Sequence, residues 1–166
     1  MEKFIFFWKT SEFYGSFSNW YMVDFNFEGH KFNCSEQAMM YMKAKLFGDQ
    51  DQADKISLTK DPASQKALGR GVVGFNESVW NAECKRIVYK VCRAKFVQNP
   101  KLLAILFSTQ GHTLVEASPK DTIWGIGLDE NHPDAMDRKK WRGKNWLGEV
   151  LTELRDDLLT GDFSKV

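Results

Sequence analysis

The sequence is poor in cysteine and histidine, and it lacks long apolar runs. Its three cysteines, Cys34, Cys84 and Cys92, are too few and too scattered for a disulfide framework or a zinc site, so we expect a reducing compartment, the cytoplasm. No apolar run approaches the roughly 18 residues that cross a bilayer, and the first ten residues have no small-residue cleavage site, so we expect neither a membrane span nor a secretory signal. The three histidines have no partners at metal-ligand spacing. We therefore expect no metal and no cofactor.

An excess of charge of one sign is also missing. The chain has 23 Lys and Arg against 22 Asp and Glu, which gives a net charge of +1. This balance excludes a protein that coats nucleic acid through a large electrostatic footprint, but it leaves room for a small basic pocket. The length of 166 residues favours one domain, spanning residues 1–166.

Aromatic residues are abundant, at 14% of the chain with 13 Phe and 6 Trp. Several of the tryptophans stand beside Gly, Asn or Asp rather than in apolar stripes. Two interpretations are open: a pocket that stacks on a flat ligand, or ordinary packing in the core and at its rim.

Short β-type segments open the chain. Phe4–Trp8 is rich in aromatic and β-branched residues, and Met22–Phe27 and Lys31–Asn33 flank a turn at Gly29 that predicts a hairpin. Farther along, Thr113–Ala117 alternates in the manner of a short strand.

Helical spacing dominates the rest of the sequence. Ser35 is expected to cap a helix that runs to about Phe47, and Asp61 and Pro62 begin a short helix that ends near Gly69. Three more segments have helical spacing: 78–98, the residues from 100 to 106, and about 145–159. Two polar stretches are expected at the surface: 49–51 as a solvated turn and 129–140 as a loop with one helical turn. The pattern predicts an α+β fold, a helix-rich domain with a few short strands.

The helix expected after Ser35 carries a carboxylate and an amine on one face. Glu36, Met39, Met40 and Lys43 stand at i, i+3, i+4 and i+7, so Glu36 and Lys43 lie within about 20° of one direction and about 10 Å apart. Ionised groups on an apolar face are costly unless they are paired or used, so this pair is a candidate for acting on one ligand. The alternative is that Glu36 caps the helix start and Lys43 extends to solvent.

A second candidate site is the run from Glu116 to Gly127. It leads from the expected strand into a turn that carries Asp121, Trp124 and Gly125. Glycine lets backbone N–H groups approach a ligand closely. The alternative is an ordinary Ser-Pro turn with a packed tryptophan.

Two further places offer positive charge. The residues Gly143–Asn145 precede the last helix, and their exposed N–H groups together with Arg142 and Lys144 would suit a phosphate. A helix N-cap by Asn145 is the alternative, and the two are compatible. Arg70 follows the expected end of a helix and is a spare cation for an anionic ligand.

Taken in order along the chain, these clusters form a set of uncommon motifs: Tyr14-Gly-x-Phe-Ser-Asn-Trp20, Ser35-Glu-Gln-Ala38, Lys43-Ala-Lys-Leu-Phe-Gly-Asp49, Leu68-Gly-Arg70, Trp80, Lys95-Phe-x-Gln-Asn99, Glu116-Ala-Ser-Pro-x-Asp-x-x-Trp-Gly-x-Gly127 and Gly143-x-Asn-x-Leu-Gly148. The set resembles the NADAR (YbiA-like) family over nearly the whole chain. One departure is Trp20, where the family commonly has Phe, and a tryptophan preserves stacking.

The resemblance implies a YbiA-like fold and an N-glycosidase, a hydrolase that breaks a ribose C1–N bond. It implies ADP-ribosylated guanine, in nucleic acid or as a free nucleotide, as the substrate. Phosphoribosylamino intermediates of riboflavin synthesis are the alternative substrate. A different class also stays open, a module that binds ADP-ribose or NAD without turnover. An acid and an amine on one buried face favour the enzyme, because a reader needs neither.

The resemblance also assigns roles to residues. It implies a part in catalysis for Glu36, and Lys43 matches the lysine proposed to form a Schiff base with the opened ribose. Direct hydrolysis, with an acid at the leaving group and a carboxylate that orients water, stays open as the alternative mechanism. From its charge and position, Asp121 is expected to bind ribose hydroxyls or to help open the ring. The segment 129–140, variable in length within the family, is expected to influence substrate choice. The expected substrate-binding residues are Tyr14, Gly15, Ser18, Asn19, Arg70, Trp80, Trp124, Gly125, Gly143 and Asn145.

Overall fold

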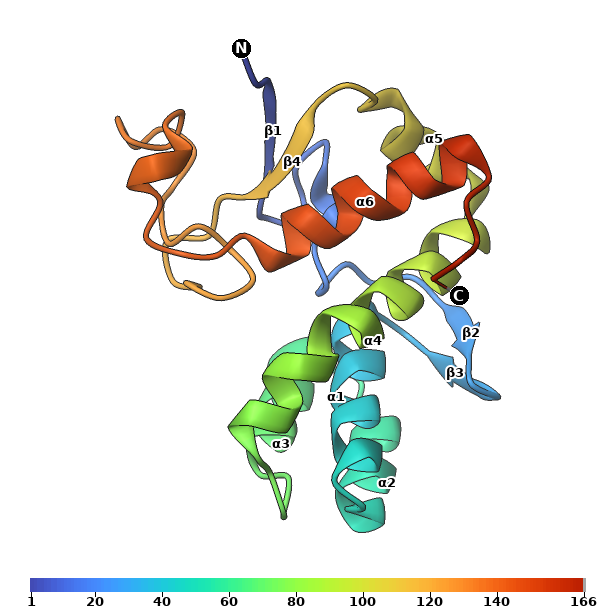
Figure 1. Cartoon of the computed structure of the whole chain (residues 1–166). Coiled ribbons are helices and arrows are strands. Elements are labelled where there is room, and N and C mark those ends of the chain that lie inside the picture. Colours follow the sequence, from blue (N-terminus) through green and yellow to red (C-terminus); the bar gives the residue numbers. More distant parts are fainter. Residues whose placement is uncertain (166) are drawn as a thin grey trace. The chain divides into compact units, whose positions relative to one another are not determined.

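The computed structural model describes residues 1–165 (Figure 1). Within them lie six α-helices, two short 3-10 helices and four short strands, so the predicted helix-rich α+β class is confirmed. The elements form two compact units: residues 19–99, and residues 1–18 together with those from 100 onward. The expectation of a single domain over residues 1–166 stays a prediction. None of the helices in the described chain is both long and apolar enough to span a bilayer.

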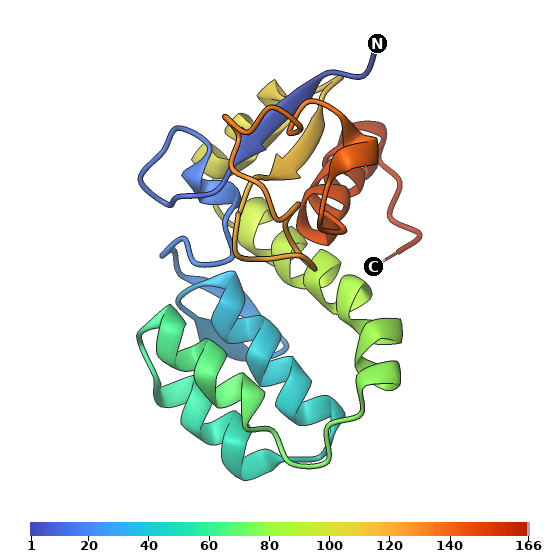
Figure 2. The ribbon, with the colours of Figure 1, turned by 90° about the vertical axis from the view of Figure 1, so that its left-hand side faces the viewer.

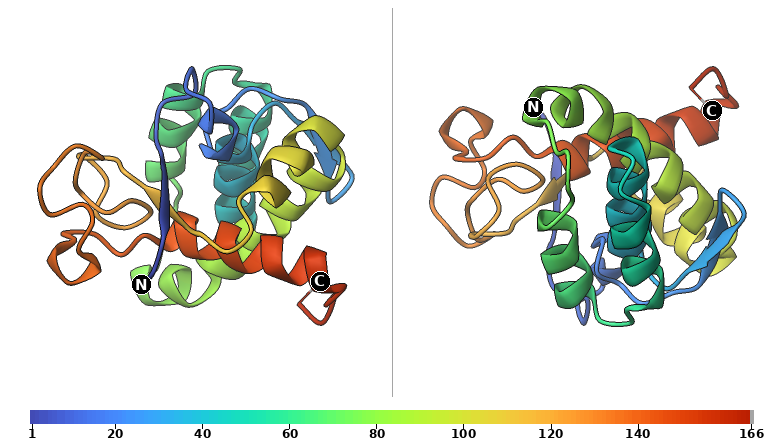
Figure 3. Two further views of the ribbon diagram at one scale, coloured as in Figure 1. Left: turned by 90° about the horizontal axis from the view of Figure 1, so that it is seen from above. Right: turned by 90° about the horizontal axis from the view of Figure 1, so that it is seen from below.

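Helix α1 (Ser35–Leu46) is the centre of the unit formed by residues 19–99. It packs against α2 (Gln50–Leu58), α3 (Pro62–Arg70) and α4 (Glu77–Val97), and Figure 3 shows α1 and α2 side by side. Six successive residues from Ser35 to Met40 are buried, because α1 has neighbours on several sides. Gly69 lets α3 approach α1 closely, since a Cβ there would collide with the sulfur of Met40.

The helix starts of this unit differ from prediction in two places. Cys34, not Ser35, occupies the N-cap of α1, and it makes no side-chain capping bond. In place of the expected turn at 49–51 the structure begins the unforeseen helix α2, which Asp49 caps by accepting a hydrogen bond from the Gln52 N–H. Asp51 is exposed, as expected. Asp61 caps α3 as predicted.

The predicted hairpin is confirmed in a shorter form. Strands β2 (Phe25–Phe27) and β3 (His30–Phe32) pair antiparallel, and Gly29 takes the positive φ of 76° that the turn requires. The Gln98 side chain joins the hairpin to the end of α4, because it bonds both the N–H and the carbonyl of Asn26 at 2.7 Å each.

The other unit is built around two parallel strands. Figure 2 shows β1 (Phe4–Phe7) beside β4 (Thr113–Glu116), with Phe4 opposite Thr113 and Phe7 opposite Glu116. Helix α6 (Trp146–Thr160) packs on β4 and also contacts α5 (Pro100–Ser108). The core of this unit includes a cluster of apolar side chains: Val115, Ala117, Ile126, Leu128 and Ala135, with Phe4, Phe6 and Trp141 packed against it.

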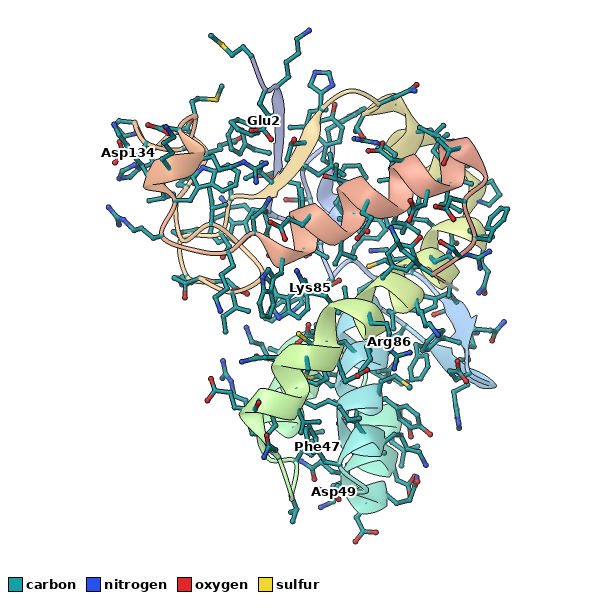
Figure 4. All side chains as sticks on the ribbon, in the orientation of Figure 1. Glu2, Phe47, Asp49, Lys85, Arg86 and Asp134 are labelled. Carbon is teal, nitrogen blue, oxygen red and sulfur yellow. The ribbon has the colours of Figure 1, made fainter. Side chains whose placement is uncertain are left out.

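The expected loop at 129–140 does contain one helical turn, the 3-10 helix Arg138–Lys140. Arg138 pairs with Glu2, and the Lys140 amine lies 3.2 Å from Asp134; Figure 4 labels both acids. These ion pairs tie the loop to itself and to the start of β1.

Candidate active site

Helix α1 carries both members of the predicted catalytic pair. Glu36, in its first turn, is only 4% exposed, and Lys43, two turns later, is half-buried. The charge of Glu36 acts on the Lys43 amine and opposes the lowering of its pKa. The two groups therefore share one electrostatic environment within residues 19–99.

Two aromatic rings flank the Lys43 amine. Its Nζ lies 4.5 Å from the centre of the Phe75 ring and 5.5 Å from that of Trp80. The sequence pointed to Trp80 but gave no reason to single out Phe75, which lies in the loop before α4 and far along the chain from Lys43. The contact depends on how that loop folds back toward α1.

The pKa of Lys43 is lowered from its ordinary value. Burial is the main cause, and the positive charge of Arg70 at the end of α3 adds to it. A lower pKa leaves more of the amine neutral at a given pH. The neutral amine is the form that can attack a carbon.

Asn19 lies beside the other member of the pair. Its main-chain carbonyl accepts a hydrogen bond from the Glu36 N–H at 2.8 Å. Its side chain is buried, and the carboxamide oxygen has no hydrogen-bond partner within residues 1–165. A buried oxygen of this kind is costly unless a polar partner reaches it, so this end of α1 suits a polar ligand.

In the other unit, the structure brings together two predicted sites, the run from Glu116 to Gly127 and the residues Gly143–Asn145. The N–H groups of Lys144, Asn145 and Leu147 donate to the carbonyls of residues 122, 125 and 124 at 3.0–3.1 Å. The Gly143 N–H donates to the Ile126 carbonyl at 2.8 Å. The expectation that these N–H groups are exposed for a phosphate is wrong, because the neighbouring turn already accepts them.

The glycines of these clusters serve close packing between the two segments. A Cβ on Gly143 would collide with the Gly125 carbonyl oxygen, and a Cβ on Gly125 would lie 2.9 Å from the Glu116 carbonyl oxygen. The Asp121 carboxylate accepts the N–H groups of Ile123 and Trp124 at 2.8 Å each through one oxygen. It therefore holds its own turn, and its role in catalysis stays a prediction.

Asn145 occupies the N-cap position of α6, as predicted, but its side chain has a different task. The side chain makes no capping bond to α6, and the backbone is left-handed with φ 54°. Its buried carboxamide accepts from the Glu116 N–H at 2.9 Å and donates to the Leu114 carbonyl at 3.0 Å. Asn145 thus joins the start of α6 to strand β4.

The remaining predicted residues also lie in this unit. Tyr14 stacks on Phe17 with ring centres 5.5 Å apart, and Trp124 meets Trp146 edge to face at 5.9 Å. Gly15 is required by packing, because a Cβ there would collide with the Thr10 carbonyl. Ser18 is buried just after the 3-10 helix that Gly15 begins.

The same unit has an open pocket that the sequence did not indicate, with a volume of about 160 Å³. Its lining combines two aromatic residues with charged side chains: Phe7, Trp8, Lys9, Glu12, Ala117, Asp129, Glu130 and Asn131. The loop that the family resemblance linked to substrate choice contributes its first three residues.

The predicted residues thus gather in two places. Asn19, Glu36, Lys43, Arg70 and Trp80 lie in residues 19–99, and the others lie in the second unit. From the sequence we also expect residues of the helix that carries Glu36, of the turn at Asp121 and of the turn at Gly143–Asn145 to line one cleft, and this stays a prediction. Within residues 1–165, no group of three His, Cys, Asp or Glu side chains is placed to hold a metal ion.

A sequence profile of the NADAR domain matches residues 6–159. The chain belongs to the NADAR family. The match runs through both units and includes every predicted site residue.

Proteins from several organisms are similar to this chain. The chain is 48% identical to Protein irg-1 of Caenorhabditis elegans over 78% of its own length and 62% of that protein. It is 42% identical to N-glycosidase R617 of Acanthamoeba polyphaga mimivirus, over 85% of this chain and 86% of R617. It is 34% identical to the riboflavin biosynthesis protein PYRR of Zea mays, but it spans only 25% of that protein.

The fold is also that of a solved NADAR protein. The NMR structure of the Escherichia coli protein YbiA superposes with a TM-score of 0.79 and 30% identity, over 97% of this chain and 88% of that one. The predicted YbiA-like fold is therefore confirmed.

Proposed function

We propose that this NADAR protein is an N-glycosidase that hydrolyses the bond between ribose C1 and a nitrogen. The observation that carries the proposal is the environment of Lys43: a half-buried amine of lowered pKa, on the helix of a buried carboxylate and against two aromatic rings. The relative R617, which covers most of this chain, is itself named an N-glycosidase.

In the proposed mechanism the ribose opens first. The ring oxygen leaves C1 and takes a proton, and C1 becomes an imine to the nitrogen of the leaving group. The neutral Lys43 amine then attacks C1, the leaving nitrogen takes a proton and departs, and C1 stays bound to Nζ as a Schiff base. Water adds to C1 and releases the sugar as an aldehyde. Glu36 moves the protons and activates the water.

The groups around the pair support binding of a ribosylated base. The Asn19 carboxamide lies at the Glu36 end of α1 and suits ribose hydroxyls. Arg70, whose charge acts on Lys43, suits a phosphate, and Trp80 suits a flat base. We take ADP-ribosylated guanine as the substrate, and Tyr14, Asp121 and Trp124 as predicted contributors.

A phosphoribosylamino pyrimidine is the second candidate substrate. The similarity to the maize riboflavin biosynthesis protein favours it. Both candidates have a ribose C1–N bond and a planar leaving group, so the same pair of residues would serve either one.

The test combines product analysis with trapping. Mass spectrometry after incubation with each substrate identifies the one that is cleaved, and borohydride should reduce the Schiff base and add the sugar's mass to the peptide that holds Lys43. Lys43→Ala and Lys43→Arg should both lose trapping and turnover, because a guanidinium keeps its charge and is not an amine nucleophile. Lys45→Arg, an exposed position on the same helix, is the matched control.

Glu36→Gln separates the two halves of the reaction. Turnover should fall by about 10²–10⁴-fold, the usual cost of losing an acid–base group. The trapped adduct should persist or accumulate if Glu36 mainly serves its hydrolysis. Full activity of Lys43→Arg would reject the covalent mechanism, and binding of ADP-ribose without cleavage of either substrate would point to a reader module.

A further inference from the structure

Phe75 is an aromatic side chain beside the Lys43 amine, and no motif of the sequence singles it out. Its ring centre is 4.5 Å from the Lys43 Nζ, closer than that of Trp80, yet the side chain is 45% exposed. Phe75 is a large apolar ring, partly exposed to solvent beside a candidate nucleophile. A ring in this position has a face available to a ligand.

Residues at the end of α1, the helix that carries Lys43, fix the position of the Phe75 ring. Phe47, at the end of α1, meets Phe75 nearly edge to face with ring centres 5.5 Å apart. Asp49 accepts a hydrogen bond from the Val73 N–H at 2.8 Å and so fixes the loop two residues before Phe75. Figure 4 labels Phe47 and Asp49 together at this end of the helix.

The loop between these anchors is closely fitted. Gly74 adopts a φ of 81°, which favours glycine, and a Cβ there would lie 3.4 Å from the Phe47 carbonyl oxygen. The ring of Phe75 thus contacts Phe47, and the loop that carries it is constrained by the Asp49 carboxylate and by the positive φ of Gly74. These constraints indicate that the Phe75 ring has a defined position, although it is partly exposed to solvent.

The chemistry explains what such a ring would contact. The Lys43 amine must come within bonding distance of C1, and the leaving group is bonded to the same carbon. The first ring atoms of the leaving group therefore lie within a few ångströms of Nζ, which is also where the Phe75 ring is found. We propose that Phe75 is the specificity-determining wall of this site, which seats a planar nitrogen heterocycle by stacking while C1 meets Lys43.

This inference rests on the proposed function and names the class of leaving group that the site selects. Removing one stacking partner from a base commonly lowers affinity about tenfold. We expect Phe75→Ala to lower kcat/KM for ADP-ribosylated guanine about tenfold, mainly through KM. Phe75→Leu should behave like Ala, because it keeps an apolar side chain without a flat face. Phe75→Tyr and Phe75→Trp should restore the activity.

A second probe has no leaving group. ADP-ribose alone presents an aldehyde when its ribose opens, so borohydride should trap it on Lys43 in the wild type. Phe75→Ala should leave this trapping unchanged within about twofold, measured across pH so that a shifted amine pKa is recognised. Val73→Ala is the matched control, since Val73 is 74% exposed in the same loop, and it should alter neither assay.

The outcomes separate the two proposals. No cleavage of either candidate substrate by the wild type would reject the proposed function, and cleavage without any trapping would reject its covalent mechanism. If the wild type is trapped, two results would overturn the stacking role. In one, Phe75→Ala loses cleavage of ADP-ribosylated guanine and trapping of ADP-ribose equally; in the other, it loses neither. A loss that Phe75→Leu restores as well as Phe75→Tyr does would show a packing role and would overturn it too.

Discussion

Arg70, the last residue of α3, lies close enough to Lys43 for its positive charge to lower the pKa of the amine. The two residues come from different helices that pack against each other. A cation beside a lysine makes protonation of that lysine more costly. Arg70 therefore has two possible effects that an experiment can separate: attraction of an anionic substrate and preparation of the nucleophile.

Arg70→Gln should move the pH profile of Schiff-base formation toward higher pH. Without the neighbouring charge the pKa of Lys43 rises, so a smaller fraction of the amine is neutral at a given pH. Trapping at pH 7 should be severalfold slower than in the wild type and should approach the wild-type rate at high pH. The measurement is the borohydride-trapping rate of ADP-ribose across pH.

The same experiment distinguishes an effect of Arg70 on the pKa of Lys43 from a contact of Arg70 with phosphate. Loss of a phosphate contact would raise the half-saturating concentration of ADP-ribose at every pH without moving the profile. Lys66→Gln, another cation of α3, is the control and should leave the profile in place. An unmoved profile in Arg70→Gln would mean that its charge does not prepare Lys43.

The sequence was a good guide to α1 and to its pair of charged residues. Helical spacing placed Glu36 and Lys43 on one face, and both lie on α1 as predicted. The spacing succeeds because a face of a helix is a local property of about two turns. Helix α2 was missed for the opposite reason: its acids and amides form a mostly exposed helix with only Ala53 and Ile56 buried, so its apolar stripe is weak.

Other parts of the site could not be read from the chain. The contact of Phe75 with Lys43 depends on the fold of a loop, and the carbonyls that accept the N–H groups of residues 143–147 lie some twenty residues earlier. The glycines near Trp124 suggested access for a ligand, whereas the structure uses Gly125 and Gly143 to let two backbones meet. The glycines were informative as residue types and Phe75 was not, and in each case the partner was set by tertiary packing.

Asn145→Ala should destabilise the unit that contains β4 and α6. The change removes both hydrogen bonds of the carboxamide: the buried one to the Leu114 carbonyl and the part-buried one from the Glu116 N–H. An unsatisfied buried group costs about 1–3 kcal/mol, and a left-handed alanine adds about 1 kcal/mol, so we expect a loss of about 2–4 kcal/mol. Urea unfolding measures the free energy.

Asn145→Gly is the paired variant, because it loses the same bonds but accepts the left-handed backbone. It should be more stable than Asn145→Ala by about 1 kcal/mol. A loss below about 1 kcal/mol in Asn145→Ala would show that water replaces the carboxamide and that the bridge is not structural.

Lys95 is a second lysine of lowered pKa, and it is fully buried in α4. Burial is the main cause and brings its pKa to about 8, from an ordinary value of 10.5. Its amine lies 5.7 Å from the centre of the Tyr21 ring, and the thiols Cys34 and Cys92 act on it electrostatically. Burial raises the pKa of each of these thiols to about 11, so both are neutral at ordinary pH.

The stability of the protein should therefore rise between pH 8 and pH 9 in a way that depends on Lys95. Above its pKa of about 8 the folded state releases the proton, while the unfolded chain keeps it up to about 10.5, so unfolding takes up a proton and higher pH favours the folded state. The two thiols give the opposite trend, which begins as the pH approaches 9, their ordinary pKa, so the Lys95 component is measured against a variant that keeps both thiols. Urea unfolding at pH 7, 8 and 9 should show that the stability of the wild type rises with pH relative to that of Lys95→Met. An equal rise in Lys95→Met would assign the pH dependence to another group.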